Sequence, residues 1–346
     1  MENAYILSAK RTPIGSFQGQ LSTLPAPKLG ATAIQAAISE AGLQPADVEE
    51  VIFGQVLTAG TGQAPARQAA IYAGIPTSAV CMTINKVCGS GLKSVMLAND
   101  SIRLGESQIV VAGGQENMTQ APHLLENARA GYRMGHVNAT DSMIKDGLWD
   151  PYNDFHMGMA AEMCVKERSF TREEQDQFAK ESYEWAQKAT EAGHFKNEIV
   201  EVEVKNRKGS VMVTQDEDPY KVKFEKISGL RPAFDREGSV TAANASNIND
   251  GAAALVLASP EAVKSKNLKP IAKIVGQASF AQDPKWFTTA PVEAMKKVSE
   301  KTGIAMTDID LFEINEAFAV VTMAAMKELD IPRDKVNVHG GSVAIG

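Results

Sequence analysis

The sequence predicts an α/β protein of two similar halves, built in layers of helix and sheet, with a further region inserted between them. Two observations support this prediction. Apolar runs typical of buried strands alternate with helical segments early in the chain, and a later stretch repeats an earlier pattern. At 346 residues the chain is long enough for two or three domains of about 100–200 residues each.

The first half is expected to alternate strands with helices. Continuous apolar runs predict strands buried on both faces at Ala4–Leu7, Val51–Leu57 and Ile109–Ala112. Helices are expected between and after them, at Ala26–Ala41, Pro65–Ala73 and Leu92–Leu104. The opening segment Met1–Pro13 is interpreted as a strand and not as a leader, because it has no basic stretch followed by an apolar run.

The region from Glu116 to Arg231 has charged helices, Met-rich turns and short strands. One helix is predicted clearly, since Thr171 and Glu174 form a capping box and Gly193 is a typical end. One face of this helix carries Phe178, Ser182, Trp185 and Ala189. The region is interpreted as an inserted domain that is either a lid without chemistry or the substrate-binding surface.

The last part of the chain repeats the first. AGLQPADVEEVIFG around Gly42 resembles TGIAMTDIDLFEIN around Gly303, and each is expected to follow a helix and lead into a strand, the second at Ile309–Ile314. Chance similarity of a common pattern is the alternative. The predicted division is 1–115 with 232–262 as the N-terminal half, 116–231 as the insertion and 263–346 as the C-terminal half. A site between two such halves would take residues from both.

Composition excludes several classes of protein. The net charge of −7, from 35 basic and 42 acidic residues, argues against a general binder of nucleic acid or membrane surfaces. No apolar run approaches the roughly 18 residues that span a bilayer. Three cysteines without CxxC spacing favour a reducing compartment and no structural zinc site. The expected location is the cytoplasm, or the mitochondrial matrix if a presequence was removed.

Cys88 is the candidate nucleophile. It lies in TINKVCGSGLKSVMLA, between a strand-like run and a helix, where the helix dipole and backbone N–H groups favour a thiolate. Gly89 and Gly91 leave room for a substrate. A buried structural thiol is the alternative. Cys81, within a strand, and Cys164, within a helix, are interpreted as structural.

Three other segments carry polar residues whose role the residues alone leave open. In NEAFA, one interpretation is that Asn315 caps a helix and Glu316 favours its first turn. The alternative is that Asn315 holds a water or donates to a developing oxyanion, while Glu316 holds Asn315 in place. His156, beside Met157, is either structural or part of a cleft wall. The small-residue stretch Thr241–Leu257 permits close approach of a ligand or close packing of helices.

Five motifs, in this order and at this spacing, resemble the thiolase family over nearly the whole chain: SAKRTPIGSF, GQAPARQA, NKVCGSGLKS, VTAANAS with NDGAAALVL, and EINEAFA. The resemblance implies a thiolase-like fold and condensation of two acetyl-CoA to acetoacetyl-CoA and CoA, or the reverse thiolysis, through an acetyl-Cys88 intermediate. The catalytic set would be Cys88, Asn315 and Glu316. Asn315 is similar to the thiolase pattern, whereas decarboxylating ketoacyl synthases carry a second histidine.

The resemblance also implies a set of binding residues. The pair His156–Met157 is similar to that of short-chain acetoacetyl-CoA thiolases. The coenzyme A and acyl pocket would be formed by His156, Met157, Lys226, Phe234, Ala245, Ser246, Ala317 and Phe318. Potassium would bind at Tyr183, Ala242, Ala243 and Ala245, and no other cofactor is required. The partners would be acetyl-CoA, acetoacetyl-CoA and CoA, and the assembly a homodimer or homotetramer.

The final segment HGGSVAIG resembles the start of the family's GGxxxxGHP motif. By this resemblance the family's activating histidine would be the residue after Gly346, and a second cysteine would follow in a CxGGG-type loop. His339 precedes the motif and does not replace that histidine. The chain is therefore expected to be truncated, and a non-catalytic protein that binds CoA or scaffolds a partner is the alternative function.

Overall fold

The computed structural model describes residues 2–207 and 209–346, which divide into two compact units. Unit 1 contains Met1–Trp149, Glu198–Thr214 and Asn249–Ile274; unit 2 contains Asp150–Asn197, Gln215–Ile248 and Val275–Gly346. The units group segments that pack together. The predicted division into two ancestral halves and an insertion is a different kind of division and stays a prediction.

The described part of unit 1 is built on a seven-stranded mixed sheet with the order β13-β1-β12-β5-β3-β4, in which β2 also pairs with β12. Strand β3 is parallel to β4 and β5, whereas β12 is antiparallel to β1 and β5. The strands are β1 (Tyr5–Arg11), β2 (Gly15–Ser16), β3 (Glu50–Gly54), β4 (Val80–Ile84), β5 (Ile109–Asn117), β12 (Asn249–Ala258) and β13 (Ala272–Lys273). The three predicted strands are confirmed with shifted ends; in the segment Met1–Pro13 the strand is β1, and Met1 lies outside the described residues.

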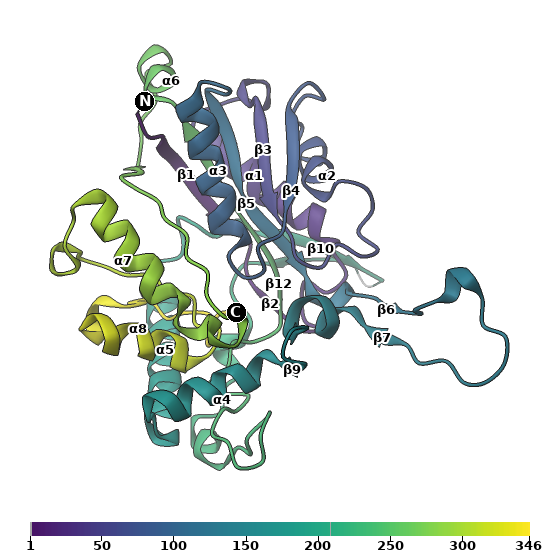
Figure 1. Cartoon of the computed structure of the whole chain (residues 1–346). Helices are drawn as coiled ribbons and strands as arrows, with labels where there is room; N and C mark the ends of the chain where they lie inside the picture. Colours follow the sequence, from purple (N-terminus) through teal and green to yellow (C-terminus); the bar gives the residue numbers. More distant parts are fainter. Residues whose placement is uncertain (1, 208) are drawn as a thin grey trace. The chain divides into compact units, whose positions relative to one another are not determined.

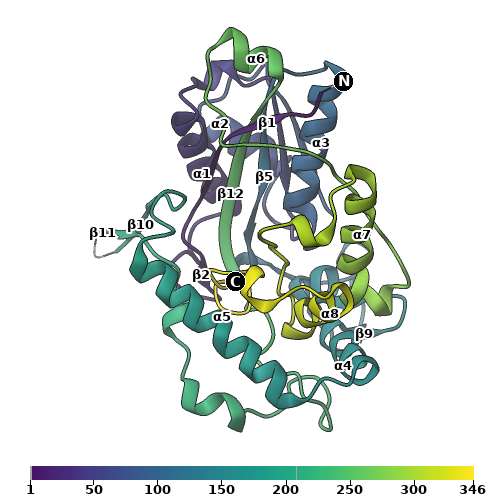
Figure 2. The same cartoon turned by 90° about the vertical axis from the view of Figure 1, so that its left-hand side faces the viewer.

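Helices cover both faces of this sheet (Figure 2). Helices α1 (Ala26–Glu40) and α2 (Pro65–Tyr72) lie on one face and α3 (Ser90–Leu104) on the other, close to their predicted positions. Because side chains alternate along a strand, Phe53 packs in the cluster beneath α1 and α2, while Ile52 packs against α3. This double covering explains the continuous apolar runs of the strands.

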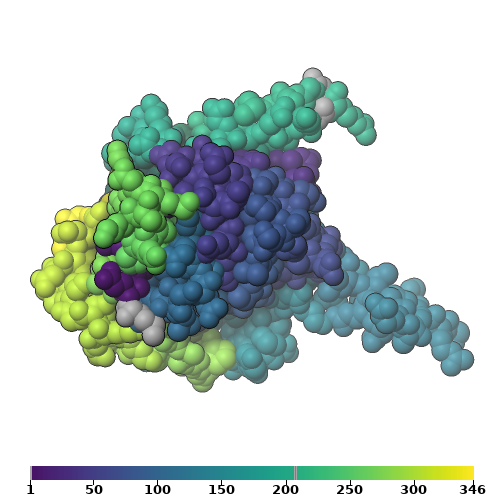
Figure 3. Space-filling model, turned by 90° about the horizontal axis from the view of Figure 1, so that it is seen from above, coloured from purple at the N-terminus to yellow at the C-terminus, as the bar shows by residue number. Residues whose placement is uncertain are grey.

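Smaller elements complete unit 1. The segment between β6 (His123–Leu124) and β7 (Thr140–Asp141) projects away from the sheet (Figures 1 and 3). A hairpin joins β10 (Val202–Asn206) to β11 (Gly209–Val213). The remaining helical segments are α6 (Pro260–Ser265), three 3₁₀ turns (Pro45–Asp47, Met118–Gln120 and Ala128–Ala130) and a π-helical turn (Ile144–Leu148). The strand β8 (Trp149–Asp150) spans the boundary between the units.

Unit 2 is mainly helical in its described residues. Its regular elements are β9 (Phe155–His156), α4 (Met157–Arg168), α5 (Arg172–Ala192), α7 (Ala290–Thr302) and α8 (Ala319–Leu329). Its 3₁₀ turns are Asp218–Tyr220, Phe224–Gly229, Pro284–Thr289, Met306–Asp308 and Arg333–Lys335. No helix in the described chain combines the length and the apolar character needed to cross a membrane.

The predicted helix after Thr171 is confirmed as α5. Its capping box joins Thr171 and Glu174 in both directions, and Gly193 ends it at φ +79°. On the predicted face Phe178, Ser182 and Ala189 are buried, and the half-buried ring of Trp185 lies 3.9 Å from the guanidinium carbon of Arg333.

The repeated pattern has a structural counterpart in both units. Helix α1 is followed by Gly42 at φ +70° and a 3₁₀ turn at Pro45–Asp47; α7 is followed by Gly303 at φ +72° and a 3₁₀ turn at Met306–Asp308. A regular strand then follows in unit 1, as β3.

The predicted strand at Ile309–Ile314 is wrong as a regular strand. Only Phe312 pairs there, in a parallel bridge with Val336. The next ladder position is occupied by a side chain, because the Ile314 N–H donates to Oδ1 of Asn337 at 2.8 Å.

Candidate active site

Cys88 lies on a sharp turn from strand to helix, as predicted. The turn joins the end of β4 to α3, whose N-cap is Gly89, and Cys88 is exposed to solvent. Val87, immediately before it, has φ +48°. A β-branched residue rarely adopts this left-handed conformation, which costs about 1–3 kcal/mol and persists only when its surroundings impose it.

Ser90 is one of the residues that impose this turn. Its buried hydroxyl accepts a hydrogen bond from the Lys86 N–H at 2.8 Å and donates one to the Val87 carbonyl at 2.6 Å. The serine can lie this deep because β3 ends in Gly54, where an added Cβ would lie 2.6 Å from the Ser90 Cβ. Two segments distant in sequence therefore fix the direction of Cys88.

The expected stabilisation of a thiolate at Cys88 is not found. Burial by the surrounding protein raises the pKa of the thiol, and the opposing hydrogen bond from its own backbone N–H is smaller. The residue touches solvent, yet the protein packed around it removes hydration that a thiolate needs. The described surroundings of Cys88 thus favour the neutral thiol.

The other two cysteines lie where they were predicted. Cys81 is half-buried within β4, and Cys164 is fully buried within α4. Burial raises the pKa of both thiols as well. Exposure to solvent therefore separates Cys88 from the other two.

His156 forms the start of α4 in unit 2. Its Nδ1 accepts a hydrogen bond from the Gly158 N–H at 3.0 Å, which caps the helix. The imidazole stacks on Phe234 with ring centroids 4.7 Å apart and planes inclined by 24°. Burial lowers the pKa of His156, so the ring is neutral and carries its proton on Nε2.

Most of the predicted pocket residues lie together in unit 2. Phe234 meets Phe318 edge-on, with centroids 5.9 Å apart. The same apolar cluster contains Met157, Ala245 and Ala317. An added Cβ at Gly158 would lie only 2.2 Å from the Phe234 ring, so this glycine permits the stacking on His156.

Ser246 and Lys226 lie differently. The Ser246 N–H donates to the Ala317 carbonyl at 3.0 Å, and its hydroxyl donates to the Ser342 carbonyl at 3.1 Å. Lys226 is exposed on the turn Phe224–Gly229. Contacts of Ser246 with a pantetheine amide and of Lys226 with a nucleotide stay predictions.

Neither residue of the Asn315–Glu316 pair caps a helix. Helix α8 begins at Ala319 with Phe318 as its N-cap, so that alternative is wrong. Asn315 is exposed, which leaves its amide available to solvent or a ligand.

Glu316 is fully buried and accepts hydrogen bonds from the Ser182 hydroxyl at 2.8 Å, Asn337 Nδ2 at 2.8 Å and the Val343 N–H at 3.1 Å. Burial raises its pKa, and these hydrogen bonds oppose the shift. Within the described residues, these hydrogen bonds join the Glu316 side chain to Ser182, Asn337 and Val343 and not to Asn315. The expectation that Glu316 holds Asn315 by a direct hydrogen bond is therefore wrong. Glu316 instead joins NEAFA to α5 and to the segment His339–Gly346.

Close packing against Glu316 and α5 explains two glycines of HGGSVAIG. An added Cβ at Gly341 would lie 2.2 Å from the Glu316 carboxyl carbon, and one at Gly340, where φ is +82°, would lie 2.6 Å from the Ser182 carbonyl oxygen. The sequence did not predict Ser182 or Asn337 as partners of Glu316. The only signal was a polar Ser182 on the otherwise apolar face of α5.

The small-residue turn before β12 is held by Asn244. This buried amide accepts from the Thr241 N–H at 2.8 Å and donates to Asp176 at 3.0 Å. Tyr183 is buried and shares a hydrogen bond with Asn247. Ala243 and Ala245 are buried and Ala242 is exposed. The potassium site at Tyr183 and these three alanines stays a prediction.

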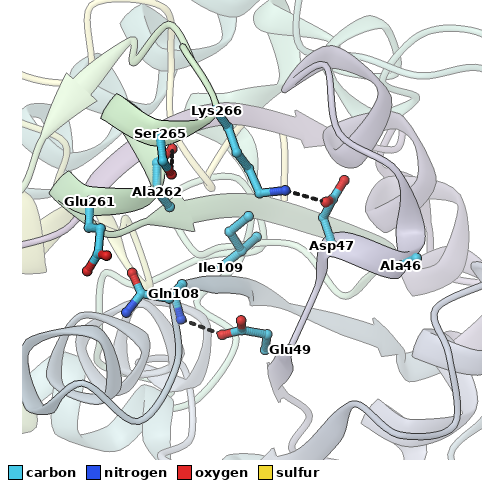
Figure 4. Close-up of a pocket in the computed structure, with 9 residues that line it drawn as sticks. All are labelled: Ala46, Asp47, Glu49, Gln108, Ile109, Glu261, Ala262, Ser265 and Lys266. Atoms are coloured by element: carbon cyan, nitrogen blue, oxygen red, sulfur yellow. Dashed lines mark hydrogen bonds and ion pairs between the residues drawn. The ribbon is translucent and has the colours of Figure 1, made fainter.

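A recess at the other end of the sheet does not resemble an active site (Figure 4). It is lined by Ala46, Asp47, Glu49, Gln108, Ile109, Glu261, Ala262, Ser265 and Lys266. Lys266 pairs with Asp47 at 2.7 Å, and Glu49 accepts from the Gln108 N–H at 2.5 Å. Asp47 and Glu49 precede β3 and Gln108 precedes β5, whereas Cys88 follows β4 at the carboxyl end of the parallel strands, the end where α/β sheets bind ligands.

Comparison with known proteins gives a consistent result. The family model of the thiolase N-terminal domain matches residues 4–261, and that of the thiolase C-terminal domain matches residues 268–346. The acetyl-CoA acetyltransferase of Cupriavidus necator is 50% identical over 100% of this chain and 88% of its own length. Acetyl-CoA acetyltransferase 2 of Arabidopsis thaliana is 52% identical over 99% of this chain and 85% of its own.

Solved structures agree with these relatives. The crystal structure of the Bacillus anthracis acetyl-CoA acetyltransferase has a TM-score of 0.97 and 42% identity, covering 100% of this chain and 88% of the other. Acat5 thiolase from Ascaris suum in complex with coenzyme A has a TM-score of 0.95 and 43% identity, covering 100% and 89%. The predicted fold class is confirmed.

Iodoacetamide should label Cys88 before Cys81 and Cys164, because Cys88 alone of the three is exposed. Peptide mapping by mass spectrometry after brief labelling of the folded protein measures the order. Labelling of all three in denaturant is the control, and earlier modification of Cys81 or Cys164 would contradict the exposure of Cys88.

Replacing Glu316 by Ala should lower the free energy of unfolding by about 3 kcal/mol, because three buried donors lose their acceptor. Urea denaturation monitored by tryptophan fluorescence measures the change. Asp310→Ala, at an exposed position of the same unit, should have almost no effect. Equal stabilities of the two variants would show that the Glu316 network is not stabilising.

Proposed function

The chain belongs to the thiolase family and is an acyltransferase, and we propose that it joins two acetyl-CoA molecules into acetoacetyl-CoA and catalyses the reverse thiolysis. The observation that carries this proposal is the exposed Cys88, held by the strained Val87 at the start of α3. A structural thiol would not need a strained turn that presents it to solvent.

In the first step the Cys88 thiolate attacks the thioester carbonyl of acetyl-CoA, and the C–S bond to coenzyme A breaks. The thiolate of coenzyme A leaves, and the acetyl group remains on Cys88 as a new thioester. In the second step another acetyl-CoA loses a proton from its methyl carbon, and this proton balances the coenzyme A thiolate of the first step, so that coenzyme A is released as the thiol. The resulting carbanion attacks acetyl-Cys88 and releases the Cys88 sulfur.

Two oxyanions develop in this sequence of steps. The Cys88 backbone N–H, which already bonds its own sulfur, is the proposed donor to the oxyanion of the acyl group. Asn315 is the proposed donor, through a water, to the enolate oxygen of the second acetyl-CoA. Asn315 is exposed and does not cap α8, so its amide is available for this role.

The apolar cluster of unit 2 is the proposed surface for the pantetheine and acyl groups. Phe234, Phe318 and Met157 supply apolar area, and the neutral His156 supplies an N–H donor. Burial raises the pKa of Cys88, so the proposed reaction needs a base or cation near the sulfur.

Protein expressed from the whole gene should catalyse thiolysis of acetoacetyl-CoA by CoA, measured as loss of acetoacetyl-CoA. Cys88→Ala should remove this activity almost entirely, by more than about 10⁴-fold, because no nucleophile remains. Cys81→Ala is the matched control and should retain activity. An active Cys88→Ala variant would exclude the acetyl-enzyme, and an inactive wild type that still binds CoA would favour the scaffold alternative.

A homo-oligomer is also proposed. Strand β4 is an edge of the unit 1 sheet and exposes Val80 and Met82, while Ile71 and Tyr72 of the adjacent α2 are also exposed. An uncovered edge strand with apolar side chains pairs readily with a second copy of the same strand.

Light scattering coupled to size-exclusion chromatography should therefore give a mass above that of the 37.1 kDa chain. Met82→Lys should reduce the mass, because it places a charge on the edge, whereas Lys205→Met on the hairpin should not. A monomeric wild type at micromolar concentration would contradict the proposal.

A further inference from the structure

The half-buried carboxylate of Glu116 lies at the same end of the unit 1 sheet as Cys88. Glu116 is two residues beyond Gly114 on β5, so both lie on one face of the sheet. That face is the one covered by α3, since an added Cβ at Gly114 would lie 3.6 Å from the Gly91 Cα. Strands β4 and β5 both run parallel to β3, and their carboxyl ends therefore meet at one edge.

The Glu116 carboxylate holds the loop that follows β3. One oxygen accepts from the Val56 N–H at 2.7 Å and the other from the Leu57 N–H at 3.2 Å. An ionised carboxylate accepts both bonds, whereas a protonated one has only one oxygen that remains a pure acceptor. Glu116 therefore accepts full hydrogen bonds from both N–H groups of the loop only when its carboxylate is charged.

The same loop supports the turn before Cys88. Asn85 Nδ2 donates to the Val56 carbonyl at 3.4 Å, and Asn85 Oδ1 accepts from the Val87 N–H at 2.9 Å. The Gln55 N–H extends the ladder to Ile84, directly before Asn85, at 3.0 Å. Hydrogen bonds therefore run without interruption from the Glu116 carboxylate to the strained Val87 and so to Cys88.

We propose that Glu116 is a positioning residue for Cys88: it fixes the Val56–Leu57 loop, against which Asn85 holds the Val87–Cys88 turn. The proposal rests on the proposed role of Cys88 as the acyl acceptor. Glu116 itself makes no contact with the reacting atoms in this scheme, and its effect passes through backbone and amide groups.

The ionisation of Glu116 is consistent with this role. Burial raises its pKa to about 7, the N–H groups of Val56 and Leu57 oppose the shift, and the charge of Asp250 on β12 adds to it. Asp250 is itself bound by the Thr119 N–H at 3.0 Å and the Thr119 hydroxyl at 2.7 Å. Among the described residues, Asp250 is the charged group that raises the pKa of Glu116 further.

The sign of the stability effect follows from this raised pKa. A carboxyl whose pKa is raised on folding contributes stability below its unfolded pKa, and this contribution is lost as the pH rises through about 7. Above that pH the charged form holds the loop at a cost to stability.

The test compares wild type with Glu116→Gln, and uses Glu106→Gln, at an exposed position after α3, as the matched control. The rate of Cys88 alkylation by iodoacetamide is measured as a function of pH, together with Tm and the kcat and KM of thiolysis. Wild type and Glu106→Gln should show an inflection near pH 7 below the ionisation of the thiol itself. Glu116→Gln should lack it, keep or raise Tm above that pH, and lose about 10-fold in kcat with little change in KM.

Several outcomes would overturn the proposal. An unchanged pH profile in Glu116→Gln would do so, and so would an unchanged kcat. If Tm and kcat of Glu116→Gln both fell at every pH, Glu116 would have a purely structural role. If Glu116→Gln does not fold, Asn85→Ala decides, since Asn85 is exposed and its loss should also remove the inflection. Alkylation needs no turnover, so an inactive wild type would refute the proposed function and leave this test valid.

Discussion

The close approach of α3 to the ends of β3 and β5 is the constraint on which the geometry of Cys88 depends. Gly54 allows it, because an added Cβ there would lie 2.6 Å from the Ser90 Cβ, and at Gly114 an added Cβ would lie 3.3 Å from the Gly54 carbonyl oxygen. Ser90, brought in by this approach, then holds both flanks of Val87. A methyl group at Gly54 would thus displace Cys88 without touching it, which is how a packing constraint becomes a constraint on chemistry.

Both units use a desolvated carboxylate to hold backbone near residues proposed for the reaction. Glu116 binds the Val56–Leu57 loop in unit 1, and Glu316 binds Ser182, Asn337 and the Val343 N–H in unit 2. Burial raises the pKa of each. Apolar side chains at these positions would fill space but could not satisfy several N–H and O–H donors at once.

Much of unit 1 was predictable because its signals are local. The helices follow from apolar periodicity and from Pro and Gly at their ends, and strands buried on both faces follow from continuous apolar runs. The clustering of His156, Phe234 and Phe318 was predictable from the family resemblance. Their individual spacing in the sequence gives no such indication.

The failures share a different cause. The segment Ile309–Ile314 has the composition of a strand, but the Asn337 side chain replaces a ladder partner. The position of Cys88 before a helix suggested a thiolate, whereas the balance depends on how much protein surrounds the sulfur. Glu316 has its hydrogen-bond partners in α5 and in the C-terminal segment, and not in its sequence neighbour Asn315. Each error depends on a group distant in sequence, which local patterns do not contain.

The cap of α4 has a consequence for recognition. Because the Gly158 N–H occupies Nδ1, the imidazole of His156 can offer only Nε2–H to any other group. Stacking on Phe234 fixes the plane in which that proton points. His156 therefore favours hydrogen-bond acceptors, such as the carbonyl oxygens of thioesters and amides, and disfavours groups that can only donate a hydrogen bond. A single backbone hydrogen bond to His156 thus selects ligands by the orientation of their polar groups, because only a group that presents an acceptor atom can bind Nε2–H.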